Sequence, residues 1–282
     1  MPVSGTSINK FSAFFILLIL CSYLKINAQG NLEIMPMRVV FEGQTKIVSL
    51  NLANTGQDTA RYVISMLEIR MKEDGTFERI EQPDSGQKFA SDFIRFFPRS
   101  ITLAPHEAQV IKVQLIKTNL LVPGEYRSHI YFRATPVEMP LGEEEPLKDS
   151  TTISVHLKAV FGITIPVIIR VGESTTETTL SDMSFQMVND TVPALSMVLN
   201  RSGNMSVYGD LKVDFISAQG KVTQVATVKG IAVYTPTSSR QFRVQLSSTS
   251  NINYQTGKLH VEYSTHQGSK SLKLAEGELE LK

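Results

Sequence analysis

The chain has 282 residues, with 28 basic and 27 acidic side chains, 42% hydrophobic residues and a single cysteine. The near-zero net charge disfavours a nucleic-acid-binding protein, because neutralising phosphates requires a basic excess. One cysteine excludes a thiolate-ligated metal site and a disulfide framework within the chain, and the globular composition excludes a disordered chain.

The first residues have the pattern of an export signal. Lys10 supplies a positive charge, Phe11 to Leu24 form an apolar run, and the small residue Ala28 stands where a signal peptidase would cut. The run is shorter than the about 20 apolar residues that a membrane-spanning helix needs. We therefore expect residues 1–28 to be a cleaved signal peptide. The mature protein would have no membrane span and no cysteine, since Cys21 lies in the leader.

The rest of the chain has the pattern of many short β-strands. Apolar residues alternate with polar ones at the two-residue period of a half-buried strand, and turn signals separate the segments. No segment keeps a helical apolar period for three turns. This pattern predicts an all-β protein built of sandwiches. The alternating sets, in chain order, are Val48, Leu50 and Leu52; Ile111, Val113 and Leu115; Tyr126, Ser128, Ile130 and Phe132; Leu211, Val213 and Phe215; Phe242, Val244 and Leu246; and Leu259, Val261 and Tyr263.

A change of composition marks a domain boundary. Between Ile165 and Glu173 the sequence passes from an apolar strand into a polar stretch rich in Ser and Thr. We place the boundary after residue 165, which gives domains of residues 29–165 and 166–282. Each is long enough for a seven-stranded sandwich of about 100 residues.

The sequence has no motif of a catalytic site. It lacks the nucleophile elbow and the zincin, P-loop and dinucleotide-binding patterns. No pair of its five histidines has metal-ligand spacing. His129, His156 and His260 fall on the polar side of predicted strands, where we expect solvated side chains. We interpret Glu143 to Glu145 as a solvated loop, and we predict no enzyme activity, no cofactor and no metal site.

Residues 151–161, TTISVHLKAVF, form the most informative predicted strand. A 15-residue connection from Pro136 to Ser150 precedes it, whereas hairpin loops usually have about 2–5 residues. One interpretation of residues 151–161 is an ordinary sandwich strand with one face toward the core. The other is a strand lent to a partner protein, in which main-chain hydrogen bonds supply affinity and alternate side chains supply specificity. The apolar face consists of Ile153, Val155, Leu157, Ala159 and Phe161.

Four stretches occur in an informative order. They are MPMRVVFEG at 35–43, KIVSLNLANTGQDTARYVI at 46–64, FFPRSITLAPHEAQVIKV at 96–113 and VPGEYRSHIYFRATP at 122–136. In this order and spacing they resemble the periplasmic chaperones of pilus assembly, which belong to the chaperone–usher system. The resemblance covers residues 32–170 well and residues 171–282 only loosely.

The resemblance implies both a fold and a function. Members of this family have two immunoglobulin-like β-sandwich domains in a boomerang arrangement and are not enzymes. They bind fimbrial subunits that lack a last strand, complete them with a donor strand, and deliver them to an outer-membrane usher. On this sequence the donor strand maps to residues 151–161. Ile153, Val155 and Leu157 would fill the subunit groove, and Ala159 and Phe161 would extend the contact. An exposed strand edge also leaves open a self-capping dimer.

The family also anchors the C-terminal carboxylate of the subunit with two basic residues in the cleft between its domains. Arg38 matches the first of them, and a guanidinium binds a carboxylate through two parallel hydrogen bonds. The alternative for Arg38 is a surface salt bridge. The second basic position, a Lys near the end of the donor strand, falls near Phe161, which is not basic. Lys158 is the nearest candidate, and the sequence leaves its role open.

A second hypothesis is a structural or adhesive surface protein that is itself a component of the fibre. Such a subunit would carry a donor segment at its mature N-terminus. Here residues 29–31 lead almost at once into the opening strand, which disfavours this hypothesis.

Overall fold

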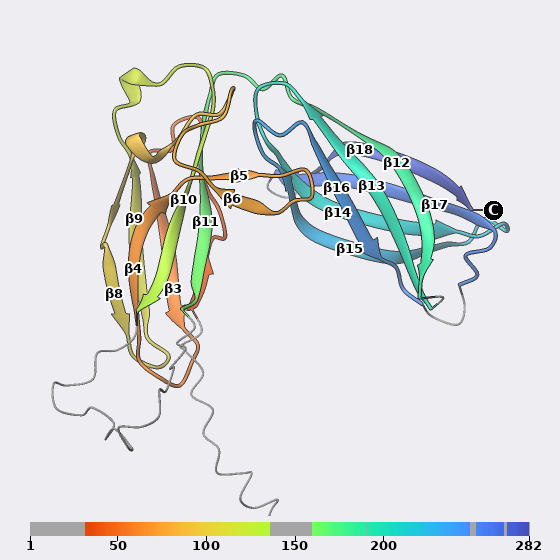
Figure 1. Cartoon of the computed structure of the whole chain (residues 1–282), viewed down its shortest axis with the longest axis horizontal. Coiled ribbons are helices and arrows are strands. Elements are labelled where there is room, and N and C mark those ends of the chain that lie inside the picture. Colours follow the sequence, from red (N-terminus) through yellow and green to blue (C-terminus); the bar gives the residue numbers. More distant parts are fainter. Residues whose placement is uncertain (1–31, 136–159, 190, 249–251, 268–269, 282) are drawn as a thin grey trace, which may run out of the picture.

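The computed structural model describes residues 32–135, 160–189, 191–248, 252–267 and 270–281. These residues form two β-sandwich domains that are set at an angle to each other (Figure 1). The predicted all-β fold of two immunoglobulin-like domains is therefore confirmed. None of the described helices is long and apolar enough to cross a membrane.

The first domain packs a four-stranded sheet, in the order β1-β3-β9-β7, against a five-stranded sheet in the order β2-β11-β10-β4-β8. Its core is formed by the inward side chains that the alternation predicted, such as Leu50, Leu52, Ile111 and Val113, all fully buried. The elements are β1 Leu32–Met35, β2 Val39–Phe41, β3 Ile47–Asn54, β4 Ala60–Leu67, η1 Ser91–Phe93, β7 Ile94–Phe97, β8 Ser100–Leu103, β9 Ala108–Leu115, η2 Thr118–Leu120, β10 Gly124–Thr135 and β11 Gly162–Val171.

The opening segment of the domain changes sheets. Strand β1 pairs antiparallel with β3 in the four-stranded sheet, whereas β2 pairs parallel with β11 in the five-stranded sheet. The parallel pairing covers Val167 to Ile169 of β11 only. Arg38 immediately precedes β2, so the change of sheet places this residue beside the middle of β11.

The second domain packs a sheet in the order β12-β13-β16 against one in the order β15-β14-β17-β18. Its core includes the predicted inward residues Leu211, Val213, Leu259 and Val261. The strands are β12 Glu177–Val188, β13 Val192–Ser202, β14 Val207–Ile216, β15 Val222–Val233, β16 Ser239–Gln245, β17 Gly257–Gln267 and β18 Lys270–Leu281.

The boundary between the domains lies later than residue 165. Strand β11 pairs with β10 from Gly162 to Val171, so the whole strand belongs to the first domain. Residues 172–176 then lead into β12, starting at Gly172, whose φ of +79° is open to glycine. The change of composition alone could not show how many residues of the apolar run pair within the sheet.

A small hairpin bridges the domains. Strands β5 (Ile69–Met71) and β6 (Phe77–Arg79) form a two-stranded sheet of their own. Figure 1 shows this hairpin reaching from the first domain across to the second. The backbone N–H of Gln241 in β16 donates a 2.6 Å hydrogen bond to the carbonyl oxygen of Glu73 at the hairpin tip.

Candidate binding site at the domain interface

A small hydrophobic cluster joins the two domains. Its buried members are Met71, Ile168, Ala232 and Tyr234, and Val40 and Tyr208 pack against them. The hairpin, β2 and β11 supply the side chains from the first domain, while β14, β15 and the residue after it supply those from the second. This shared core fixes where the polar side chains around it lie.

A buried carboxylate holds the interface together. The side chain of Glu125 in β10 has no exposed surface, and its Oε2 lies 3.2 Å from Nε of Arg170 in β11. From the second domain, the Ser206 N–H donates to the same oxygen at 3.0 Å, and the hydroxyls of Ser206 and Thr235 donate to Oε1. Because a buried charge is tolerated only when it is paired and hydrogen-bonded, Glu125 ties both domains to one point.

Arg127, also in β10, is buried at the same interface. It is 1% exposed, and its Nη2 donates a 3.2 Å hydrogen bond to the carbonyl oxygen of Thr235. Its Cζ lies 4.7 Å from the ring centroid of Tyr234. Burial lowers the pKa of Arg127 below its ordinary value. This guanidinium is enclosed between the domains and is not exposed to a ligand from outside.

The prediction that His129 is solvated is wrong. His129 is 2% exposed, and the Phe77 ring of the hairpin lies 5.9 Å from its ring. Burial and the neighbouring Arg127 lower the pKa of His129 from 6.5 to about 3. The polar side of β10 is therefore covered by the hairpin and the second domain, which no local pattern could show. His260 is partly exposed, with Nε2 3.7 Å from Oε2 of Glu276, and His156 lies outside the described residues.

Arg38 has more exposed surface than Arg127 and, unlike Arg170, it has no acidic partner among the described residues. It is half-buried, and its Cζ lies 4.0 Å from the ring centroid of Tyr208 in the second domain. It forms no ion pair with any acidic side chain in the described part of the chain, and its Nε has no hydrogen-bond partner there. Burial, and then the nearby Arg170, lower the pKa of Arg38. No described residue supports the alternative of a surface salt bridge.

The edge of β11 beside Arg38 is partly open. Strand β10 pairs with β11 along one edge from Gly162 to Val171, whereas β2 pairs with the other edge only from Val167 to Ile169. Among the described strands, none pairs with that second edge between Gly162 and Pro166. The open edge thus ends where β2 begins, immediately next to Arg38.

Most of the predicted donor strand lies outside the described residues. Ile153, Val155, Leu157, Lys158 and Ala159 lie outside the described residues. Phe161, at the end of the predicted strand, is 67% exposed and precedes β11. Its carbonyl oxygen accepts a 3.0 Å hydrogen bond from the N–H of Ala134 in β10.

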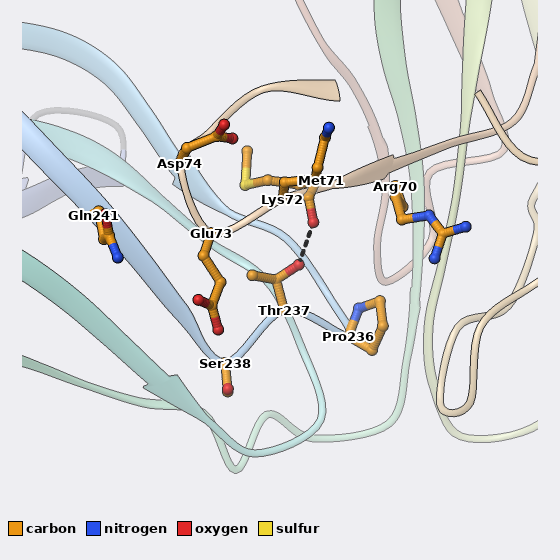
Figure 2. Close-up of a pocket in the computed structure, with 9 residues that line it drawn as sticks. All are labelled: Arg70, Met71, Lys72, Glu73, Asp74, Pro236, Thr237, Ser238 and Gln241. Atoms are coloured by element: carbon orange, nitrogen blue, oxygen red, sulfur yellow. Dashed lines mark hydrogen bonds between the residues drawn. The ribbon is translucent and has the colours of Figure 1, made fainter. Parts of the chain in front are cut away.

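A polar depression of about 620 Å³ lies where the hairpin meets the second domain (Figure 2). In it the Thr237 hydroxyl donates a 2.7 Å hydrogen bond to the carbonyl oxygen of Met71. Arg70 points away from the other lining side chains (Figure 2) and pairs with Asp84 at 3.0 Å. The residues that line this depression therefore form part of the contact between the hairpin and the second domain. No cluster of His, Cys, Asp or Glu suited to a metal ion occurs among the described residues.

Sequence reasoning missed Tyr208. One signal was available, because Tyr208 is an aromatic residue out of phase with the inward set of its strand, Leu211, Val213 and Phe215. Glu125 and Arg127 both lie in the quoted stretch 122–136, but the pattern did not assign them to an interface.

Neither a protein-family model nor a curated protein sequence matches the chain. Among solved structures, the chain is similar to the class 5 fimbriae chaperone CfaA, with 13% identity and a TM-score of 0.42, over 89% of this chain and 99% of that one. It is similar to the E. coli chaperone DraB with 15% identity and a TM-score of 0.41, over 90% and 98% of the chains. It is similar to the Salmonella enterica SafB chaperone in complex with SafA pilin with 10% identity and a TM-score of 0.39, over 90% of this chain and 96% of that one. Each of these three solved structures contains a chaperone.

Proposed function

We propose that this protein is a periplasmic chaperone that binds fimbrial subunits by donor-strand complementation and delivers them to an outer-membrane usher. The observation that carries the proposal is the open edge of β11, from Gly162 to Pro166, which ends beside an arginine without an acidic partner among the described residues. The sequence resemblance of residues 32–170 supports the same function.

The geometry suits a strand that ends in a carboxylate. A strand added along the open edge of β11 meets β2 at Val39, so it must stop there, next to Arg38. Its terminal carboxylate would then accept hydrogen bonds from a guanidinium that has no internal ion pair. Such charge-assisted bonds contribute on the order of 1.5–3 kcal/mol each.

The predicted donor residues precede β11 in the sequence. Phe161 is six positions before Val167, or about 20 Å at the rise of an extended strand, and residues 151–160 precede it. A subunit strand whose C-terminus lies at Arg38 would therefore run parallel to β11, with its preceding residues beside Leu157, Val155 and Ile153. Burial of these three side chains in a subunit groove would contribute on the order of several kcal/mol.

Co-purification of subunits with variant chaperones tests the proposal. Replacing Ile153, Val155 and Leu157 together with Ser should abolish co-purification, because the groove-filling area is lost, while the circular dichroism spectrum and melting temperature stay unchanged. Arg38→Ala should weaken capture about 10- to 100-fold through the loss of the charged hydrogen bonds. Arg95→Ala, an exposed arginine on β7 of the other sheet, should leave capture intact.

Normal capture by the triple variant would show that residues 151–161 are not the donor strand. Equal capture by the Arg38→Ala variant and the Arg95→Ala variant would remove Arg38 from the binding site. Recovery of the protein in sheared fibres instead of the soluble periplasm would favour a fibre component.

A further inference from the structure

We infer that Tyr208 of the second domain positions the Arg38 guanidinium for carboxylate binding, so that both domains build the anchor site. This inference rests on the proposed function, because it assigns a further residue to the site proposed for Arg38. It explains why a residue of the first domain would need the second domain in order to bind a subunit.

The fold directs the Tyr208 ring at the first domain. In β14, Val207 packs into the core of the second domain, whereas Tyr208 packs against the interface cluster that includes Val40. Successive side chains of a strand point to opposite faces, so the orientation of Tyr208 follows from that of Val207. On the neighbouring strand β15, a Cβ at Gly230 would lie 3.0 Å from the Tyr208 hydroxyl oxygen. Because Gly230 has no side chain, the Tyr208 ring can occupy this space.

The contact holds the cation without using its donors. The Cζ of Arg38 lies 4.0 Å from the ring centroid of Tyr208, within the about 6 Å over which a ring face attracts a cation. A guanidinium has five N–H donors in a fixed plane, and a ring face beneath that plane accepts none of them as a conventional acceptor. The Nε of Arg38 is itself buried and has no hydrogen-bond partner among the described residues.

Arg127 and Arg170 are engaged inside the protein. Arg170 pairs with Glu125 and donates a 2.8 Å hydrogen bond to the Ser206 carbonyl oxygen, and Arg127 is 1% exposed. Arg38 is thus the half-buried cation that remains available to an added strand. Because a flexible side chain loses conformational freedom when it binds, holding it in place beforehand raises affinity. The Tyr208 ring supplies that restraint.

The test uses N-acetylglycine as a minimal chain-terminal carboxylate and N-acetylglycinamide as its uncharged control, titrated against the full mature chain. The backbone amide NMR signals of Val39 and Val40 report binding in every variant. We expect the acid, and not the amide, to shift these signals. Tyr208→Leu should weaken the acid's affinity about three- to tenfold, because the ring attraction is lost, whereas Tyr208→Phe should stay within about twofold of the unsubstituted protein.

A second measurement separates positioning from a general structural effect. In the ligand-free protein, the order parameter of the Arg38 Nε–H should fall in Tyr208→Leu and be retained in Tyr208→Phe. In an Arg38→Ala background, Tyr208→Leu should have no further effect on the acid titration.

The possible failures are distinguishable. If Arg38→Ala abolishes binding of the acid while Tyr208→Leu binds it as the unsubstituted protein does, the role of Tyr208 is refuted and Arg38 remains the anchor. If Arg38→Ala binds the acid unchanged, the anchor itself is refuted, and the inference about Tyr208 falls with it.

Discussion

Arg38, Arg127 and Arg170, which lie at the interface, have different partners. Arg170 pairs with the buried Glu125 at 3.2 Å, and Arg127 donates to the Thr235 carbonyl oxygen. Arg38 instead lies over the Tyr208 ring and has no acidic partner among the described residues. The guanidinium groups of Arg127 and Arg170 therefore contribute to the contact between the domains, and we propose that Arg38 binds a ligand.

His129 gives the first domain a specific pH dependence. Its pKa in the folded state is about 3, against 6.5 for an ordinary histidine, so between these values the unfolded chain binds a proton that the folded chain does not. The stabilising contribution is complete above pH 6.5 and is lost as the pH falls toward 3. When the pH is lowered from 6.5 to 5, the free energy of unfolding of the unsubstituted protein should fall. In His129→Phe, whose side chain cannot titrate, this fall should be smaller by about 2 kcal/mol.

Urea unfolding at both pH values measures this difference, and comparing slopes cancels any constant cost of the substitution. His260→Phe is the control, since His260 is partly exposed. Identical pH dependence in the His129→Phe variant and the unsubstituted protein would show that His129 is not held neutral in the fold.

At the scale of strands and hairpins, alternation in the sequence identified several strands, whereas β12, β13, β15 and β18 contain none of the alternating sets. The set Val48, Leu50 and Leu52 lies in β3, and the set Ile111, Val113 and Leu115 lies in β9. The hairpin strands β5 and β6 escaped detection because each has three residues, too few to show a period. The hairpin in turn covers His129, so the missed element and the wrongly predicted exposure have the same cause.

The site was predictable only where local sequence defines it. Arg38 stands before an apolar triplet in a quoted stretch, which was enough to single it out. Tyr208 approaches Arg38 from a position 170 residues later in the chain, and only the packing of the two domains brings them to 4.0 Å. The role of Lys158 stays a prediction, because that residue lies outside the described part.

The hairpin tip should restrict motion between the domains. Replacing residues 72–76 with Asn-Gly keeps the Met71–Phe77 pairing through a two-residue turn. It removes the hydrogen bonds of Glu73 with Gln241 and Ser239, each contributing about 1 kcal/mol. We expect the rotational correlation times of the two domains, from 15N relaxation, to be equal in the unsubstituted protein and to differ in this variant.

The matched control shortens the β14–β15 turn, residues 217–221, to Asn-Gly, since Ile216 and Val222 pair across it at the far end of β14. Equal correlation times in both shortened proteins would show that the rest of the interface fixes the domains without the hairpin tip.

At the scale of the whole molecule, the joint and the proposed site share strand β11. Ile168 lies in the interface cluster and Arg170 binds Glu125, while the strand's open edge begins at Gly162. A subunit bound along that edge would therefore contact the first domain up to Arg38, and there it would reach Tyr208 of the second domain.

We propose that residues 151–161 complete a subunit as one β-segment and lead into β11, whose edge is open from Gly162 to Pro166. Hydrogen–deuterium exchange of the protein, free and in complex with its co-purified subunit, tests this claim most directly. We expect the amides of residues 151–166 to be strongly protected from exchange on binding, and the exchange of β14 to β18 to change little beyond the interface. Unchanged exchange in residues 151–166, with protection elsewhere, would contradict it.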